Sequence, residues 1–395
     1  MNRTDQPTGP SVRTRRILAA TASVGAAVVL TAAIAQASDF AAGHAPANGM
    51  HGQPAMGSGA AKPVRLLATT SGTKTTGTSG AMGTTDQAMT DHAMAPSSMG
   101  SAMDANPSTS MSSSMRQPRF SFQTINDAAD PTFNQLLGIT NRGRIVGYFG
   151  SGADAAHPNK GFQVRAPHGQ NNFQNENFPG SVQTQVVGIN NNNVTVGFWV
   201  DGAGANFGFV ERGGTFHSVS NPATPPSAPF NQLLGVNDYG VAVGFFNDAA
   251  GAAHGYTFDT RTGQFADVVL PVMADSVTAT GIADDGTVAG FYISNKVTSG
   301  FVLRHGHFQR LSFGAGSNTQ ALGINDGHEV VGSYVDAAGT THGFLWSAGR
   351  GLTRVDDPQA AAGTVVNGLN NRGQLVGFYV DAAGNTNGFL AGRRS

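Results

Sequence analysis

Six copies of one glycine-framed pattern constrain the fold of this chain more than any other feature. In each copy, two glycines lie nine positions apart and enclose a short polar turn followed by an apolar run. The framing pairs are Gly138 and Gly147, Gly188 and Gly197, Gly235 and Gly244, Gly281 and Gly290, Gly323 and Gly332, and Gly368 and Gly377. Successive first glycines are separated by 50, 47, 46, 42 and 45 residues. A pattern with this period indicates a repeated structural module and not a single binding loop.

Each module divides into four short apolar runs that are separated by turn residues. In the fifth module these runs are residues 320–324, 329–335, 342–346 and 308–311. The Asn, Asp and Gly residues between the first two runs tolerate positive φ and therefore favour a hairpin. Four strands in roughly 45 residues are typical of a propeller blade. The sequence therefore predicts an all-β fold, a six-bladed β-propeller of four-stranded blades over residues 119–395.

The side chains after the second glycine support this prediction. Five modules carry two adjacent large residues there, namely Tyr148-Phe149, Phe198-Trp199, Phe245-Phe246, Phe291-Tyr292 and Phe378-Tyr379. Neighbouring residues of a strand point to opposite faces, so both faces of the sheet must be covered, as in a blade between two others. We expect the framing glycines to leave room for the rings of the neighbouring blade or to let the strand bend.

The lengths of the connections predict how the ring closes. The connection from the last run of a module to the next first glycine is long, which places the first run innermost and the last run outermost. The chain then ends one strand short, and residues 120–125 supply an extra strand before the first module. We expect 120–125 to pair with 387–391 and complete the last blade, which hides two exposed sheet edges.

Residues 1–37 have the features of a signal peptide. Arg13, Arg15 and Arg16 precede an uncharged segment, 17–37, which ends in a small-x-small cleavage pattern. The arginines loosely resemble a twin-arginine signal. The segment is also long enough to remain as an uncleaved membrane anchor. Both alternatives place the rest of the chain outside the cytoplasm, in the periplasm, in the medium or at the cell surface, and only the second implies a membrane partner.

Residues 38–118 are rich in Ser, Thr, Gly, Ala, Met and Pro, which predicts a disordered tether. Nine methionines between Met50 and Met115, with His44, His51 and His92, are soft ligands that suit copper(I). No tight Met-x-x-Met cluster is present, so a plain tether is the alternative. The chain has no cysteine, which removes disulfides, thiolate metal sites and a thiol nucleophile.

The motif G-I-N-[ND]-x-G-x-[VL]-V-G-x-Y, then D-x-x-G, then H-G-F, resembles the bacterial extracellular HAF-type repeat. The histidine occurs in His254-Gly255-Tyr256 and His342-Gly343-Phe344. The other modules carry Lys160, Phe207, Ser299 and Asn387 at that position. The resemblance implies an exported repeat protein and brings no enzymatic activity with it.

The sequence contains no recognisable catalytic or phosphate-binding motif. A formal net charge of −1 argues against a nucleic-acid partner. His305 and His307 lie in a turn without a third ligand, and the Asp-x-x-Gly turns offer calcium one carboxylate each, so we expect no metal site and no cofactor. Those turns contain Asp201, Asp248, Asp336 and Asp381. Glutamate is scarce in the modules, although a pair of catalytic carboxylates forms in space and not in sequence.

The long connections before each first run are the least uniform segments, and we expect them to gather at one end of the ring with the Asp-x-x-Gly turns. Propellers bind ligands with such loops. Two near copies there, Phe133-Asn134-Gln135 and Phe230-Asn231-Gln232, are the candidate binding residues. The alternative is that both phenylalanines fill gaps between blades.

These observations lead to one main hypothesis and two alternatives. The main hypothesis is a non-enzymatic binding module for a glycan or an envelope protein. The first alternative is a hydrolase or lyase at the channel mouth, which Asp154, His157 or Asp356 within about 5 Å of another carboxylate or imidazole would favour. The second alternative is copper handling by the methionine-rich segment.

Overall fold

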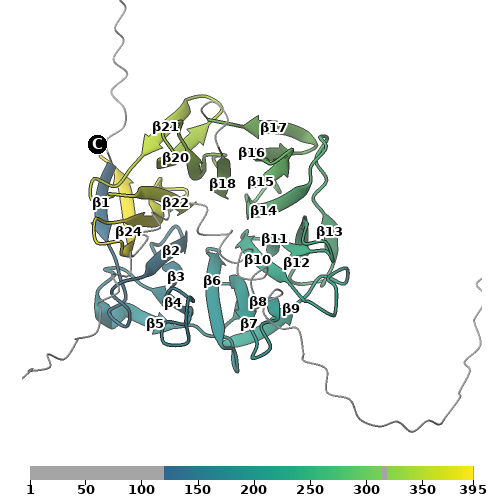
Figure 1. Cartoon of the computed structure of the whole chain (residues 1–395), viewed down its shortest axis with the longest axis horizontal. Helices are drawn as coiled ribbons and strands as arrows, with labels where there is room; N and C mark the ends of the chain where they lie inside the picture. The colour runs from purple at the N-terminus through teal and green to yellow at the C-terminus, as the bar shows by residue number, and fades with distance from the viewer. Residues whose placement is uncertain (1–119, 314–317, 395) are drawn as a thin grey trace, which may run out of the picture. The chain divides into compact units, whose positions relative to one another are not determined.

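The computed structural model describes residues 120–313 and 318–394. They form six four-stranded antiparallel sheets arranged as the blades of a ring, which confirms the predicted six-bladed β-propeller (Figure 1). The strand order follows the chain in blades 1 to 5, and β2, β6, β10, β14, β18 and β22 surround the centre.

The bounds of the strands follow the repeat. Blade 1 contains β2 (Asn134–Ile139), β3 (Ile145–Phe149), β4 (Lys160–Val164) and β5 (Phe173–Asn175), with the 3-10 turn η1 (Gln170–Asn172) before β5. Blade 2 contains β6 (Gln183–Ile189), β7 (Thr195–Val200), β8 (Asn206–Arg212) and β9 (Thr215–Val219). Blade 3 contains β10 (Asn231–Val236), β11 (Val241–Asn247), β12 (Ala253–Asp259) and β13 (Phe265–Asp267).

The second half of the ring has the same organisation. Blade 4 contains β14 (Ser276–Ile282), β15 (Val288–Ser294), β16 (Val297–Arg304) and β17 (His307–Leu311). Blade 5 contains β18 (Thr319–Ile324), β19 (Val330–Val335), β20 (Thr341–Ser347) and β21 (Gly351–Val355). Blade 6 contains β22 (Gly363–Leu369), β23 (Leu375–Val380) and β24 (Thr386–Arg393) from the end of the chain, together with β1 (Phe120–Thr124).

The ring closes where the two ends of the described chain meet in blade 6. β1 pairs antiparallel with β24, with Phe120 opposite Arg393 and Thr124 opposite Phe389. The Ile125 N–H then donates to the Gly388 carbonyl at 2.8 Å, and the Ile125 side chain is buried. The pairing of the 120–125 segment with the last strand, which the connection lengths predict, is therefore present.

The first framing glycines bring the inner strands of successive blades together. A Cβ on Gly188 would lie 3.0 Å from Gly235 Cα and from the Leu234 carbonyl oxygen, and a Cβ on Gly368 would lie 2.4 Å from the Leu137 carbonyl oxygen. Any larger residue would push the blades apart, so this position needs glycine for a close approach of backbones.

The second framing glycines leave room for a β-bulge in the inner strand of each blade. All six pairings of inner and second strands shift register just before the first glycine. A Cβ on Gly197 would consequently lie 2.0 Å from the Gln185 carbonyl oxygen. The expected strand bend is thus present, but the ring at this glycine belongs to Phe209 of the same blade and not to the neighbouring blade. The reason is that Phe209 lies directly opposite Gly197 on the third strand.

The hydrophobic core lies between successive blades. Val196 and Val210 of blade 2 pack with Leu233 and Tyr256 of blade 3, for example, and Tyr256 is completely buried. Because second strands such as β11 and β23 are buried on both faces, apolar residues follow one another along them and do not alternate with polar ones. This burial drives the assembly of the ring.

The N-terminal predictions concern residues without a described structure. The signal peptide expected at 1–37 and the tether expected at 38–118 both lie outside the described residues. Within the part that is described, no helix has the length and apolar character needed to cross a membrane.

Candidate binding face

The ring has two faces that carry different connections. The turn face carries the hairpins between inner and second strands. The loop face carries the hairpins between second and third strands together with the long connections between blades. Val182 N–H, from a long connection, donates to the Val200 carbonyl at the end of a second strand. In the next blade the second strand is the donor, since Asn247 N–H at its end donates to the Phe230 carbonyl of a long connection. The long connections therefore gather beside the Asp-x-x-Gly hairpins, as the sequence predicts.

A closed circle of hydrogen bonds joins all six blades on the turn face. Each hairpin contributes one Asn or Asp, and its backbone N–H donates to the side-chain oxygen of the equivalent residue in the next blade, at 2.7 to 3.0 Å. We call these residues the Asx ring, which consists of Asn141, Asn191, Asp238, Asp284, Asp326 and Asn371. The Asn371 N–H closes the circle on Asn141 Oδ1.

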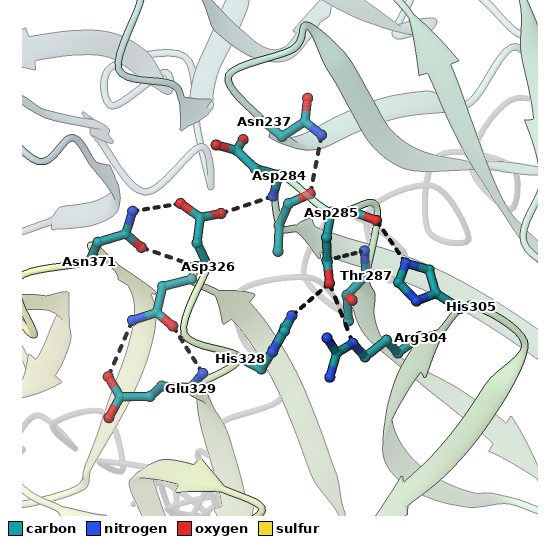
Figure 2. A network of polar contacts seen from close by, with 12 residues as sticks. Asn237, Asp284, Asp285, Thr287, Arg304, His305, Asp326, His328, Glu329 and Asn371 are labelled. Carbon is teal, nitrogen blue, oxygen red and sulfur yellow. Dashed lines mark hydrogen bonds and ion pairs between the residues drawn. The ribbon is translucent and has the colours of Figure 1, made fainter.

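Charged residues of blades 4 and 5 extend this network, as Figure 2 shows. Burial raises the pKa of Asp284, and the carboxylates of Asp326, Asp238 and Asp285 raise it further. Asp285 accepts a bond from His328 Nε2 at 2.9 Å and pairs with Arg304 at 3.4 Å. Burial alone would raise the pKa of Asp285, but hydrogen bonds from Thr287 and His328 outweigh burial and lower it. The polar groups here link blades to one another.

The central channel is narrow and mainly apolar. Val187, Leu234 and Leu322, from three different blades, belong to one apolar cluster. The cavity between the inner strands has a volume of about 110 Å³, which suits a few water molecules and not a sugar ring. Asp154, His157 and Asp356 are not among the residues that line it.

The six candidate residues from the sequence lie at the start of β2 and β10. Asn134, Gln135, Asn231 and Gln232 are completely buried, Phe230 is 9% exposed and Phe133 is half-buried.

Their contacts are internal. Asn134 accepts a bond from the Asp127 N–H, and Asn231 accepts one from the Asn221 N–H. The rings of Phe133 and Phe230 lie 5.9 Å from those of Tyr148 and Phe245, respectively. The structure gives these residues a packing role, and their part in ligand binding stays a prediction.

Two His–Asp pairs meet the distance that was set for the hydrolase alternative. His157 Nδ1 lies 3.1 Å from Asp154 Oδ1 in an exposed loop. His342 lies between two carboxylates, with Nε2 3.0 Å from Asp336 and Nδ1 3.0 Å from Asp356. His342 lies near the start of the third strand β20, away from the channel, and only 5% of its side chain is exposed.

The contact between His342 and Asp336 is a repeated feature of the hairpins. His254 Nε2 lies 2.8 Å from Asp248 Oδ2, and Asn387 Nδ2 donates to Asp381 Oδ2 at 3.1 Å. The hydrogen bonds from these histidines lower the pKa values of Asp248 and Asp336. An asparagine makes the same bond, so this position of the motif first of all fastens the Asp-x-x-Gly turn to the third strand.

Two of the scarce glutamates meet between blades 1 and 2. The Thr195 hydroxyl donates to Glu176 and lies 3.3 Å from Glu211, and these two residues are 5% and 7% exposed. Burial raises the pKa of Glu176 to about 7, with a further contribution from the Glu211 charge, while the Thr195 hydroxyl and Arg144 act in the opposite direction. The sequence showed no sign of this pair, since the two residues lie 35 positions apart.

Half-buried aromatic rings cluster on the loop face of blades 1 and 2. We call Phe149, Phe178, Trp199 and Phe207 the aromatic arc. Phe178 and Trp199 stack with their centroids 4.3 Å apart and their planes 1° apart, and Phe207 stacks on Trp199 at 5.0 Å. The Trp199 Nε1–H donates to the Ser218 hydroxyl. These contacts fix the rings of Phe178, Trp199 and Phe207, and all four residues of the arc remain partly open to solvent.

The sequence reasoning did not select the aromatic arc as a site. It used Phe149 and Trp199 only to argue that both faces of a blade are covered. Their equivalents in blades 3, 4 and 6, Phe246, Tyr292 and Tyr379, are indeed buried. The sequence signal that could have pointed to the arc was the presence of Lys160 and Phe207, which replace the histidine of the motif in the same two blades.

Within 120–313 and 318–394, no group of three or more His, Asp or Glu residues is arranged to hold a metal ion. His305 Nε2 contacts the Asp285 carbonyl at 3.2 Å in an exposed turn. The methionines and histidines considered for copper lie outside the described residues.

No known protein-family profile matches the chain, and no curated protein matches its sequence. TolB from Acinetobacter baumannii is similar in structure, with a TM-score of 0.45 and 10% identity over 64% of each chain, so the match covers less than two thirds of TolB. AofleA from Arthrobotrys oligospora has a TM-score of 0.46 and 9% identity over 71% of this chain and 87% of its own. A six-bladed fungal lectin from Aleuria aurantia, whose description names a novel fucose recognition mode, has a TM-score of 0.41. Its identity is 10% over 65% of this chain and 90% of its own. Similarities this low do not indicate a ligand for this chain.

Proposed function

We propose that this chain is a non-enzymatic binding module that holds a glycan on the loop face of blades 1 and 2. The aromatic arc carries the proposal. Rings that are fixed by stacking yet partly exposed offer large contact areas at low conformational cost, which is typical of binding surfaces. The apolar faces of sugar rings pack on flat aromatic groups, while their hydroxyls need nearby amides.

The remaining surfaces support this choice of face. On the turn face, the Asx ring commits its backbone N–H groups and side-chain oxygens to bonds between blades. The channel has too little volume for a saccharide. On the loop face of blades 4 to 6, the residues equivalent to Lys160 are Ser299, His342 and Asn387, and all three are buried.

The proposal includes export and membership of the HAF-type repeat proteins. The basic and uncharged segments within residues 1–37 support export, and the six modules with their D-x-x-G and H-G-F elements support membership. A glycan at the cell envelope is the partner that fits an exported propeller of this kind. An envelope protein is the other class of partner that a binding face could serve.

A glycan and peptide array tests this function directly. We expect glycan binding that Trp199→Ala weakens by about tenfold, since a central aromatic contact contributes more than about 1 kcal/mol. Tyr239→Ala is the matched control, because Tyr239 is an exposed aromatic, at 62%, on the opposite face. Equal loss in both variants, or binding of peptides alone, would contradict the proposal.

A hydrolase or lyase is the second candidate, and specific contacts favour it. His342 lies between two carboxylates, and burial raises the pKa of Glu176 beside Glu211, as for a general acid. The burial of all three side chains supports binding over catalysis. Release of reducing ends from a polysaccharide panel, abolished by Glu211→Gln or by His342→Asn, would establish the enzyme and overturn the binding module.

A further inference from the structure

A pocket on the loop face lies between the outer half of blade 1 and the connection to blade 2. Its volume is about 520 Å³, within the range of small-molecule sites. It is lined by Phe149, Lys160, Asn175, Asn177, Phe178 and the Pro179–Ser181 turn. Two members of the aromatic arc thus form walls of a concave site.

The aromatic wall is held from behind. Trp199 stacks against Phe178 in parallel at 4.3 Å, and the Phe216 ring meets Phe178 edge-on at 5.7 Å. Phe178 therefore keeps its orientation without a ligand, and binding does not have to order it. A flat ring in a pocket of this size suits a pyranose.

The polar groups of the pocket include unused donors. Asn177 Oδ1 accepts a bond from the Gly161 N–H at 3.0 Å, which fixes the amide and leaves Nδ2 without a partner among the described residues. The equivalent Asn126 makes the same contact with the Gly388 N–H, but its Nδ2 donates to Asn387. Lys160 takes the place of Asn387 in blade 1, so the Asn177 amide stays available to a ligand.

Lys160 is the charged residue of the lining. Its ammonium makes one long bond, 3.4 Å to the Val182 carbonyl, and it forms no ion pair with any carboxylate in the described ranges. An ammonium beside free amide donors attracts an anionic oxygen, because hydrogen bonds between charged partners are about twice as strong as neutral ones.

We propose that this pocket binds a carboxylate-bearing sugar, such as a uronic acid residue of an acidic polysaccharide. The carboxylate pairs with the Lys160 ammonium, the Asn177 and Asn175 amides bond the hydroxyls, and Phe178 and Phe149 contact the apolar face of the ring. The inference rests on the proposed glycan-binding function and specifies its ligand class.

The test compares a galacturonic acid trisaccharide with a neutral galactose trisaccharide by calorimetry, at low and at physiological salt. We expect the acidic sugar to bind more tightly than the neutral one, and less tightly as salt rises. Lys160→Met, which removes the charge and offers no oxygen acceptor to the Asn177 amide, should weaken binding of the acidic sugar by about tenfold and leave the neutral sugar unchanged. His254→Asn, at the same repeat position in blade 3, is the control and should change neither.

Each outcome separates this inference from the broader function. Equal binding of both trisaccharides, insensitive to Lys160→Met, would overturn the acidic-sugar inference and leave glycan binding intact. Glycan binding that depends on Trp199 but not on Lys160 or Asn175 would place the ligand outside this pocket. Binding of an acidic peptide, and of no saccharide, would overturn both. Unchanged melting temperatures show that the variants are folded.

Discussion

On the turn face, six equivalent positions carry only Asn or Asp, whereas on the loop face the six equivalent positions near the start of the third strands carry Lys160, Phe207, His254, Ser299, His342 and Asn387. The turn-face side chain must accept a hydrogen bond from the preceding blade, and only a short side chain with an oxygen at this reach does so. On the loop face, backbone bonds and the turn aspartates hold the hairpins. The side chain near the start of each third strand is therefore free to differ between blades. One repeat thus provides a uniform structural face and a varied contact face.

The largest expected effect comes from removing β1, which tests whether the Asx ring alone can hold the blades together. A chain that begins at residue 127 leaves the β24 edge unpaired and removes the buried Ile125. We expect it to lose about 5 kcal/mol or more of unfolding free energy and to associate through that edge. Urea unfolding and size-exclusion chromatography measure both. A chain that begins at residue 119 is the control, and equal midpoints would show that β1 is dispensable.

Next in size is a substitution inside a blade. Gly197→Ala places a Cβ 2.0 Å from a backbone oxygen, so strands β6 and β7 must separate. We expect a loss of about 3 kcal/mol, as for severe overpacking. Gly202→Ala, in a loop-face hairpin with open space around it, should change stability by less than about 0.5 kcal/mol. Similar costs for the two variants would refute the bulge explanation.

The buried Glu176, which joins blades 1 and 2 beside the pocket, predicts a pH dependence. Its pKa rises from 4.5 to about 7 on folding, so between these values the unfolded chain has lost a proton that the folded chain still holds. Stability should therefore fall as pH rises through this window, by up to about 3 kcal/mol. Thermal unfolding of the wild type and of Glu176→Gln measures it, and the variant should lack this slope. An equally steep slope in the variant would assign the effect to another group.

The smallest effect concerns one link of the Asx ring. Asn141→Ala removes the acceptor for the Asn371 N–H and should cost about 1 kcal/mol. Asn141→Asp keeps an oxygen there, as Asp238 does in its own blade, and should be nearly neutral. Denaturant midpoints distinguish the two. If both variants match the wild type, the ring of hydrogen bonds does not explain why only Asn and Asp occur at these positions.

The repeat period carried most of the information about the fold. Glycines nine residues apart and the length of the connections led to six four-stranded blades, to the inner position of the first run and to the pairing of 120–125 with the last strand. These features are local in sequence or depend on counting strands. The candidate site was harder to predict because it depends on exposure. Asn134 and Gln135 follow a loop that contains exposed residues, yet both are completely buried.

The sequence by itself determined the modules, because glycine and turn residues act through the backbone conformations that only they adopt readily. Only the tertiary structure decided which residues of different modules come into contact. The Asx ring requires six hairpins at one radius, Glu176 and Glu211 meet across a blade interface, and Phe178 reaches Trp199 from a connecting segment. The free amide of Asn177 likewise follows from which side chain starts the adjacent third strand. Such contacts depend on how the blades pack around a common axis. The spacing of residues along the chain does not encode the distances between blades.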